Sequence, residues 1–198
     1  MKRVVFLSVV AALLFANAAA AQKVVCTQKV LAAFAGERDA VARYEASAAK
    51  AVEEGYLGAA ALFRAAAKAE QIHAGRFAAV IKDRGVEVPA GGAAAPVIGT
   101  TAENLRAAAT AERAERDGTY RDAIDACQKS DPQVATLFDV TRDAEVEHLN
   151  LFSDAAQHAD NMKEAATFYV CRVCGYTTNV KLPLCPSCRD QHAMEPVE

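Results

Sequence analysis

The sequence predicts an all-α protein, in which a four-helix bundle with a long crossover between its second and third helices precedes a small C-terminal metal domain. Three observations carry this prediction. The 198 residues are 53% hydrophobic, rich in alanine and free of Trp, which favours closely packed helices. A glutamate followed 33 residues later by a Glu-x-x-His motif occurs twice, the second set displaced by 75 residues from the first. Two Cys-x-x-Cys pairs lie near the C-terminus. We expect the bundle over 22–165, with a linker at 85–99, and the metal domain over 166–198.

The first 21 residues have the layout of a secretory signal peptide. Lys2 and Arg3 precede an uncharged apolar run that starts at Val4 and closes with four alanines ending at Ala21, which offer small-residue cleavage sites. A retained membrane anchor is the alternative, because about 18 apolar residues is borderline for spanning a bilayer. Export implies an oxidising compartment, most simply a bacterial periplasm, and no membrane contact after cleavage.

The first two helices follow from apolar periodicity and a stop signal. Apolar side chains recur at three- and four-residue spacing over about 25–53 without proline, which is typical of a long amphipathic helix. Gly55 ends this helix, and a second is expected over about 56–84. The turn lies near the midpoint between Glu37 and Glu70, so an antiparallel hairpin brings these two glutamates to the same height.

The second pair of helices repeats this geometry. Thr100 and Glu103 form a predicted capping box at the start of the third helix. The stretch 130–132, Ser-Asp-Pro, supplies a stop, an N-cap and a proline suited to the first turn of the fourth helix. This turn lies near the midpoint between Glu112 and Glu145. The helices expected here span about 101–129 and about 132–164.

The connection between the two hairpins, 85–99, is a loop by its Gly- and Pro-rich composition. Its 15 residues, fully extended, reach roughly 50 Å at about 3.3 Å each. A helix of about 28 residues is only about 42 Å long. A crossover running the length of the bundle is therefore feasible, and such connections are typical of ferritin-like bundles.

The doubled motif predicts a metal site inside the bundle. Residues three apart on a helix share a face, so Glu70 with His73, and Glu145 with His148, each present a carboxylate and an imidazole in one direction. The alternative is a set of solvated side chains on Ala-rich helices, since a single Glu-x-x-His is a common accident. Two copies in the same register argue against that alternative.

The two halves differ in one carboxylate. Glu115 lies one turn after Glu112, whereas the matching position in the first half is Ala40. Five glutamates buried together would repel one another severely unless cations neutralised them, so inward-facing helices would require metal. Mixed carboxylate and imidazole ligands suit iron or manganese; zinc is an alternative that prefers fewer and softer ligands.

Several stretches of the bundle carry a family resemblance. They are 31–37, 43–44, 53–56, 69–73 and 101–105, together with Glu112 and Glu115. With them the chain resembles rubrerythrin over almost its whole mature length. The resemblance implies a non-haem di-iron centre in a ferritin-like bundle that reduces hydrogen peroxide to water, with the two irons moving between the ferrous and ferric states.

The resemblance also implies roles for individual residues. His148 matches a ligand to one iron, while Glu115 and His73 match the pair between which the other iron shifts as its redox state changes. Tyr44 and Tyr120 match tyrosines near the family's site; ordinary core packing is the alternative for both. We take Glu115, His73, Tyr44 and Tyr120 as candidate catalytic residues. The expected shared or terminal carboxylates are Glu37, Glu70, Glu112 and Glu145.

The two Cys-x-x-Cys pairs, with ten residues between them, indicate a tetrahedral metal site. In isolation this motif would favour zinc. Beside a di-iron bundle it resembles the rubredoxin-like tail of rubrerythrin, whose single iron feeds electrons to the di-iron site, so iron is expected with zinc as the alternative. Arg189 departs from the glycine that the family has after its fourth cysteine. A disulfide-bonded tail is a third alternative. The predicted ligands are Cys171, Cys174, Cys185 and Cys188.

The remaining cysteines, Cys26 and Cys127, are predicted to form a disulfide. With a full-length crossover, the first helix begins at the end of the bundle where the third finishes. Cys26 lies about 16 Å along its helix from Glu37, and Cys127 lies about 18 Å from Glu115, so both reach the same level. Two buried free thiols are the alternative.

Three functions are compatible with these sequence features. The leading one is a peroxidase that takes electrons from an unidentified donor protein, and the family resemblance implies a head-to-tail homodimer in which one subunit's tail docks on the other's bundle. The second is a ferritin-like ferroxidase or iron-binding protein, and the third is a non-enzymatic metal-binding module with zinc in the tail. The net charge of −3 and the absence of a clustered basic stretch argue against nucleic acid as a partner.

Overall fold

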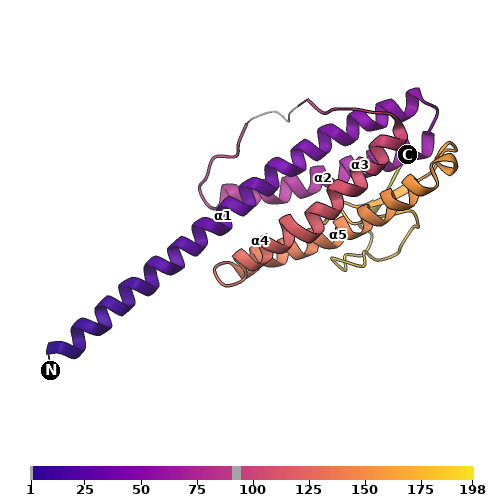
Figure 1. Ribbon diagram of the computed structural model, residues 1–198. Coiled ribbons are helices and arrows are strands. Elements are labelled where there is room, and N and C mark those ends of the chain that lie inside the picture. Colours follow the sequence, from indigo (N-terminus) through magenta and orange to yellow (C-terminus); the bar gives the residue numbers. More distant parts are fainter. Residues whose placement is uncertain (1, 91–94) are drawn as a thin grey trace.

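A computed structural model describes residues 2–90 and 95–198, with side chains described from residue 21 onward. It confirms the predicted helical bundle with a small C-terminal domain (Figure 1). The bundle helices are α1 (Lys2–Glu53), α2 (Leu57–Asp83), α3 (Thr101–Ala114), α4 (Tyr120–Cys127) and α5 (Pro132–Gln157), with a π-helical segment η1 (Glu115–Thr119) joining α3 to α4. The tail contains a 3-10 turn η2 (Ala159–Met162) and the strands β1 (Phe168–Cys171), β2 (Thr177–Thr178) and β3 (Met194–Val197).

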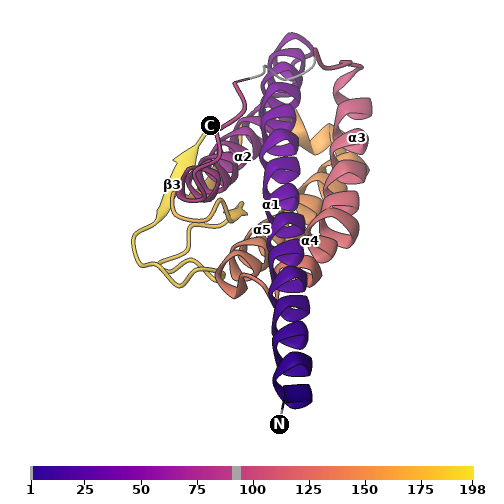
Figure 2. The same ribbon diagram turned by 90° about the vertical axis from the view of Figure 1, so that its left-hand side faces the viewer.

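Helix α1 is longer than the sequence pattern predicted. It begins at Lys2, not near residue 25, and its first part extends past the other helices in both views (Figures 1 and 2). No Gly or Pro interrupts 4–21, so nothing local stops the helix there. The predicted signal peptide, 1–21, lies outside the described side chains except for Ala21. Among the described residues, no helix is both long and apolar enough to cross a membrane.

The described parts of the crossover, 84–90 and 95–100, adjoin the end of α2 at one end of the bundle and the start of α3 at the other, as the predicted full-length connection requires (Figure 1). Helix α2 starts at the α1–α2 turn, where Gly55 has φ +79°, and α3 starts beside that same turn. There the Glu54 carboxylate accepts a hydrogen bond of 2.7 Å from the backbone N–H of Thr101. The predicted capping box is present, because Thr100 accepts from the backbone of Glu103 and Glu103 accepts from the backbone of Thr100.

Helix α5 begins as predicted and ends early. The Asp131 side chain caps it by accepting from the Val134 backbone N–H, with Pro132 following the cap. The helix ends at Gln157, about seven residues before the expected end. Tertiary contacts explain the difference: the chain turns to pack on the start of α2, where the backbone N–H of Leu57 donates to the carbonyl of Lys163.

Two aromatic groups fill the bundle core. One contains Tyr44, Phe63 and Phe152, whose ring centroids lie 5.2–6.1 Å apart. The other contains Phe77, Tyr120 and Phe138, with centroids 5.0–6.3 Å apart. All six side chains are buried. Each group contributes one tyrosine, and these two tyrosines reach the polar residues that lie between the groups.

The tail is a three-stranded antiparallel sheet in the order β2-β1-β3, and it packs beside α2 (Figure 2). Lys68 on α2 pairs with Glu195 on β3 at 2.7 Å. Gly175 and Arg189, which follow the second and fourth cysteines, both have positive φ, at +80° and +62°. The second turn therefore keeps the left-handed conformation without a glycine, at a cost of about 1 kcal/mol.

Candidate metal centre

Six of the predicted ligands meet between helices α1, α2, α3 and α5. Nδ1 of His73 lies 2.8 Å from Glu70 and 3.2 Å from Glu145. Nδ1 of His148 lies 2.9 Å from Glu145 and 3.3 Å from Glu70. These four side chains thus cross-link α2 and α5, as the matched register of the repeat predicts.

The six residues form two overlapping groups of possible metal ligands. In each group the ligand atoms lie within 4.8 Å of one another. Glu70 and Glu145 belong to both groups, which places them where bridging carboxylates would lie. The first group is completed by Glu37 and His73, and the second by Glu112 and His148.

The donor set fits cations. Each of the six side chains is at most 1% exposed. Each of the four glutamates has one buried oxygen that makes no hydrogen bond, and such orphaned acceptors are costly unless a partner is supplied. One such oxygen per carboxylate, facing two imidazole nitrogens, suits two divalent cations with mixed oxygen and nitrogen ligands.

The pKa shifts within the cluster also indicate that it suits cations. Burial raises the pKa of Glu37, and the nearby Glu70 carboxylate raises it further. Burial raises the pKa of Glu112 to about 8. Burial alone would raise the pKa of Glu70 as well, but the two imidazoles, His148 first, outweigh it and hold that pKa below its usual range. Without metal, protons carry the compensating charge that metal would otherwise supply.

The two predicted tyrosines donate to the outer carboxylates. The Tyr44 hydroxyl donates to Glu112, and the Tyr120 hydroxyl donates to Glu37. Burial, followed by the neighbouring carboxylates, raises the pKa of both tyrosines well above 10. They therefore stay protonated as donors while their rings pack in the core, so both roles considered from the sequence are present together.

Glu115 is the predicted ligand that lies outside both groups. It opens the π-helical segment η1, is partly buried, and has a pKa raised by burial and then by Glu112 and Glu37. The π-helix was not anticipated; Gly118 inside the predicted helix was its one visible signal, because π segments insert a residue into a helix and often lie at functional sites. Arg43 lies close by, with its guanidinium 5.3 Å from the Tyr44 ring centre.

The four tail cysteines form a second candidate site. Cys171 and Cys188 have their sulfurs 3.6 Å apart, and those of Cys174 and Cys185 are 3.5 Å apart. All four are free thiols whose sulfurs lie within 4.8 Å of one another, so the disulfide-bonded tail is not observed. Metal–sulfur bonds of about 2.3 Å in a tetrahedron place sulfurs about 3.8 Å apart, which this cage matches.

The tail lies directly on the histidines of its own chain. Nε2 of His73 donates to the backbone carbonyl of Cys174 at 3.0 Å. Nε2 of His148 lies 3.0 Å from the hydroxyl oxygen of Thr177. The approach is so close that a Cβ on Gly175 would collide with the His73 imidazole. Neither histidine contact was anticipated from the sequence, because each joins residues of different domains.

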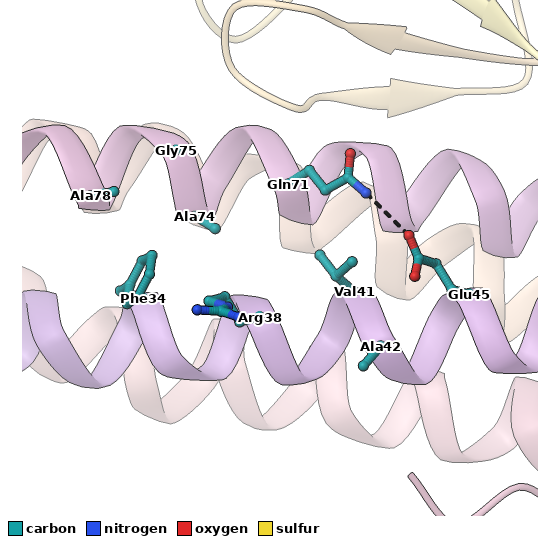
Figure 3. Close-up of a pocket in the computed structure, with 9 residues that line it drawn as sticks. All are labelled: Phe34, Arg38, Val41, Ala42, Glu45, Gln71, Ala74, Gly75 and Ala78. Atoms are coloured by element: carbon teal, nitrogen blue, oxygen red, sulfur yellow. Dashed lines mark hydrogen bonds between the residues drawn. The ribbon is translucent and has the colours of Figure 1, made fainter. Parts of the chain in front are cut away.

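A surface hollow of about 460 Å³ lies between α1 and α2 (Figure 3). A hydrogen bond of 3.2 Å from Gln71 to Glu45 crosses it. None of the six clustered ligands lines it, so the hollow and the carboxylate cluster are separate features. Its lining includes Phe34, Arg38, Val41, Gln71, Ala74 and Ala78.

Cys26 and Cys127 form the predicted disulfide, with Cα atoms 4.9 Å apart. Both are fully buried. Arg84 covers the bond, donating to Asp131 at 2.6 Å and approaching the sulfur of Cys26 at 3.5 Å. The disulfide joins the beginning of the bundle part of α1 to the end of α4.

Comparison with known proteins matches residues 29–156 to the rubrerythrin family model. The chain is 34% identical over 177 residues to a rubrerythrin of Porphyromonas gingivalis, an alignment that covers 85% of this chain and 88% of that protein. It is 33% identical over 165 residues to a nigerythrin of Nitratidesulfovibrio vulgaris, covering 81% of this chain and 80% of that one. A solved structure of fully reduced, all-ferrous nigerythrin is similar with a TM-score of 0.79 and 31% identity, covering 86% of each chain.

Proposed function

Because the chain belongs to the rubrerythrin family, we propose that it is a non-haem di-iron peroxidase that reduces hydrogen peroxide to water and protects against oxidative stress. The observation that carries the proposal is the pair of overlapping ligand groups sharing Glu70 and Glu145. Two bound irons would supply the two electrons that cleave the O–O bond of peroxide. A mononuclear binding site would need only one such group.

The chain's own residues would hold and shield this chemistry. Glu37 and His73 complete one metal position, and Glu112 and His148 complete the other. The Tyr120 and Tyr44 hydroxyls would fix the outer carboxylates by donating to one oxygen of each, which leaves the second oxygen for metal. Burial of the whole cluster excludes bulk water, which strengthens every electrostatic contact inside it.

The tail would serve as an electron relay. A tetrathiolate iron at the four cysteines would supply single electrons, with zinc as the alternative occupant. The 3.0 Å hydrogen bond from His73 to the Cys174 carbonyl supports this role, because it joins a ligand of one site directly to a ligand residue of the other. Iron storage alone requires no such connection, so the ferroxidase reading is the weaker candidate.

We further propose that the protein works in an exported state, in a bacterial periplasm, after removal of residues 1–21. The disulfide between Cys26 and Cys127 supports this, because such bonds persist in oxidising compartments. An unidentified donor protein would supply electrons. A head-to-tail homodimer would exchange between two copies the same tail contacts that one chain makes here.

Metal analysis with visible and EPR spectra, followed by peroxide addition to the anaerobically reduced protein, tests the function. We expect three irons per chain, two in the bundle and one in the tail, and a fast return of the ferric-tetrathiolate colour as peroxide reoxidises the reduced protein. A colourless zinc-loaded tail would discard the relay. The ferroxidase would be supported instead if oxygen rapidly oxidised the ferrous iron but the protein did not reduce peroxide when a reductant was added.

Glu115→Ala should lower peroxide turnover by about 100-fold while leaving the fold intact, because the redox-dependent ligand exchange assigned to Glu115 would be lost and one metal would be misplaced. Asp117→Ala is the matched control, since Asp117 lies in the same π-helical segment but is exposed and pairs with Arg116. Steady-state peroxidase rates and far-UV circular dichroism check both. If the Glu115→Ala rate equals that of the wild type, the role assigned to Glu115 is wrong.

A further inference from the structure

We propose that Thr177 is a positioning residue for His148: from the tail, its hydroxyl fixes the imidazole tautomer and orientation that metal binding in the bundle requires. The proposal rests on the two-metal site of the proposed function. It concerns a side chain outside both ligand groups. It also assigns the tail a structural role at the bundle site, in addition to electron transfer.

The single hydrogen of the Thr177 hydroxyl determines which group donates in its contact with His148. The Thr177 hydroxyl has one hydrogen, and it donates this hydrogen to the carbonyl of Gly175 at 3.0 Å. Its oxygen, 3.0 Å from Nε2 of His148, can therefore only accept from the imidazole. Nε2 must carry the hydrogen, which leaves Nδ1 of the neutral ring with its lone pair toward the carboxylates.

Nδ1 is the nitrogen that the metal needs. It lies 2.9 Å from Glu145, 3.3 Å from Glu70 and 3.7 Å from Glu112. Metal-binding histidines usually donate their other ring N–H to an acceptor, which orients the ring and raises its basicity. Thr177 supplies this acceptor from β2, where its backbone pairs with Val170, and it is fully buried.

The other imidazole has an acceptor that mutation cannot remove. His73 donates to the backbone carbonyl of Cys174, so every side chain at that position keeps this acceptor. Among the residues that the structure describes, Thr177 is therefore the one tail side chain whose substitution can remove a hydrogen bond to a bundle histidine. Within the described residues, His148 Nε2 makes no other hydrogen bond, and water cannot easily replace one in so buried a position.

Thr177→Val tests the proposal, because valine keeps the shape and removes the acceptor. We expect the affinity of the bundle site for ferrous iron, measured anaerobically against a competing chelator, to fall about 10- to 100-fold. Thr177→Ser keeps the hydroxyl and should retain wild-type affinity. Thr178→Val is the matched control on the same strand and should have no effect, since within the described part of the chain the Thr178 hydroxyl accepts a hydrogen bond from the backbone N–H of Val180 and makes none to a bundle histidine.

Proton NMR of the cobalt-loaded protein gives a second readout. Two slowly exchanging, hyperfine-shifted ring N–H signals are expected in the wild type, and Thr177→Val should lose one of them to fast exchange with water. Wild-type iron affinity together with both signals in Thr177→Val would overturn the proposal. The proposal would also be overturned if Thr177→Ser lost both the iron affinity and the N–H signal, because packing of the threonine methyl group would then explain the effect of Thr177→Val. A protein that binds iron normally but turns over no peroxide would refute the proposed function and leave the role of Thr177 intact.

Discussion

Without metal in the bundle, the free energy of unfolding of the protein should fall as the pH rises from about 5 to about 9. Glu112 alone should account for a fall on the order of 4 kcal/mol. The pKa of this buried carboxyl is about 8 in the folded chain, against 4.5 for an ordinary glutamate. A raised folded-state pKa means that folding favours the protonated form. Its stabilising contribution is therefore full below about pH 4.5 and is lost as the pH rises through 8.

The two histidines also make the metal-free protein less stable as the pH rises. Burial lowers the pKa of each imidazole, but the carboxylates, Glu145 first for His73 and Glu70 first for His148, outweigh it and raise the pKa above 6.5. Folding therefore favours both imidazolium forms, and this stability is also lost as the pH rises above 6.5. Glu70 has the opposite sign, because its pKa is lowered: its stabilising contribution is full above about pH 4.5 and is lost only as the pH falls below that value.

Urea denaturation of the chelator-stripped protein at several pH values measures this effect. Bound metal requires deprotonated carboxylates and neutral imidazoles, so the loaded protein should be stabilised more as the pH rises and should show no such decline. Glu112→Gln, studied without metal, should show a shallower decline because its amide does not titrate. Stability of the metal-free wild type that stays flat or increases from pH 5 to 8 would contradict the charge distribution described above.

Replacing Cys26 and Cys127 together by alanine should lower the free energy of unfolding by about 4 kcal/mol. The disulfide joins residues 101 apart in the sequence, so its loss frees a long loop of the unfolded chain. The buried position adds to the loss, because Arg84 and Asp131 would then lie over two small side chains. Urea denaturation of the metal-loaded protein gives the difference.

Thiol counting provides the control for this prediction. Protein purified from an oxidising compartment, unfolded and stripped of metal, should titrate four of its six cysteines without reductant and all six with it. The double alanine variant should titrate four under both conditions. Six reactive thiols in the wild type without reductant would show that the bond does not form in that compartment.

The helical hairpins and the ligands on them could be predicted because their signals are local. Helical periodicity and one turn per hairpin fix the heights of Glu37, Glu70, Glu112 and Glu145, and the structure brings all four together with both histidines. The disulfide followed from the same geometry once the crossover was given its full length. The sheet of the tail was not predicted, because the cysteine motifs of this segment indicated only a rubredoxin-like metal domain.

The features that escaped prediction depend on contacts between distant residues. Helix α5 ends at Gln157 because the following chain packs on Leu57, about one hundred residues earlier in the sequence. The docking of the tail on His73 and His148 joins two domains whose relative placement no periodicity encodes. The π-helical segment at Glu115 is local, but one glycine is too weak a signal to distinguish it from an α-helix.

Because the tail contacts the histidines of its own chain, this arrangement completes the bundle site without a second subunit, whereas the exchanged tails of the proposed homodimer would make completion depend on protein concentration. An intramolecular contact has a fixed effective concentration, set by the connection between the domains, whereas a contact between subunits weakens on dilution. The short stretch between α5 and β1 keeps Cys174 and Thr177 close to their imidazoles. A single chain at trace abundance would therefore keep both histidines oriented, whereas a homodimer with exchanged tails would lose these contacts on dilution.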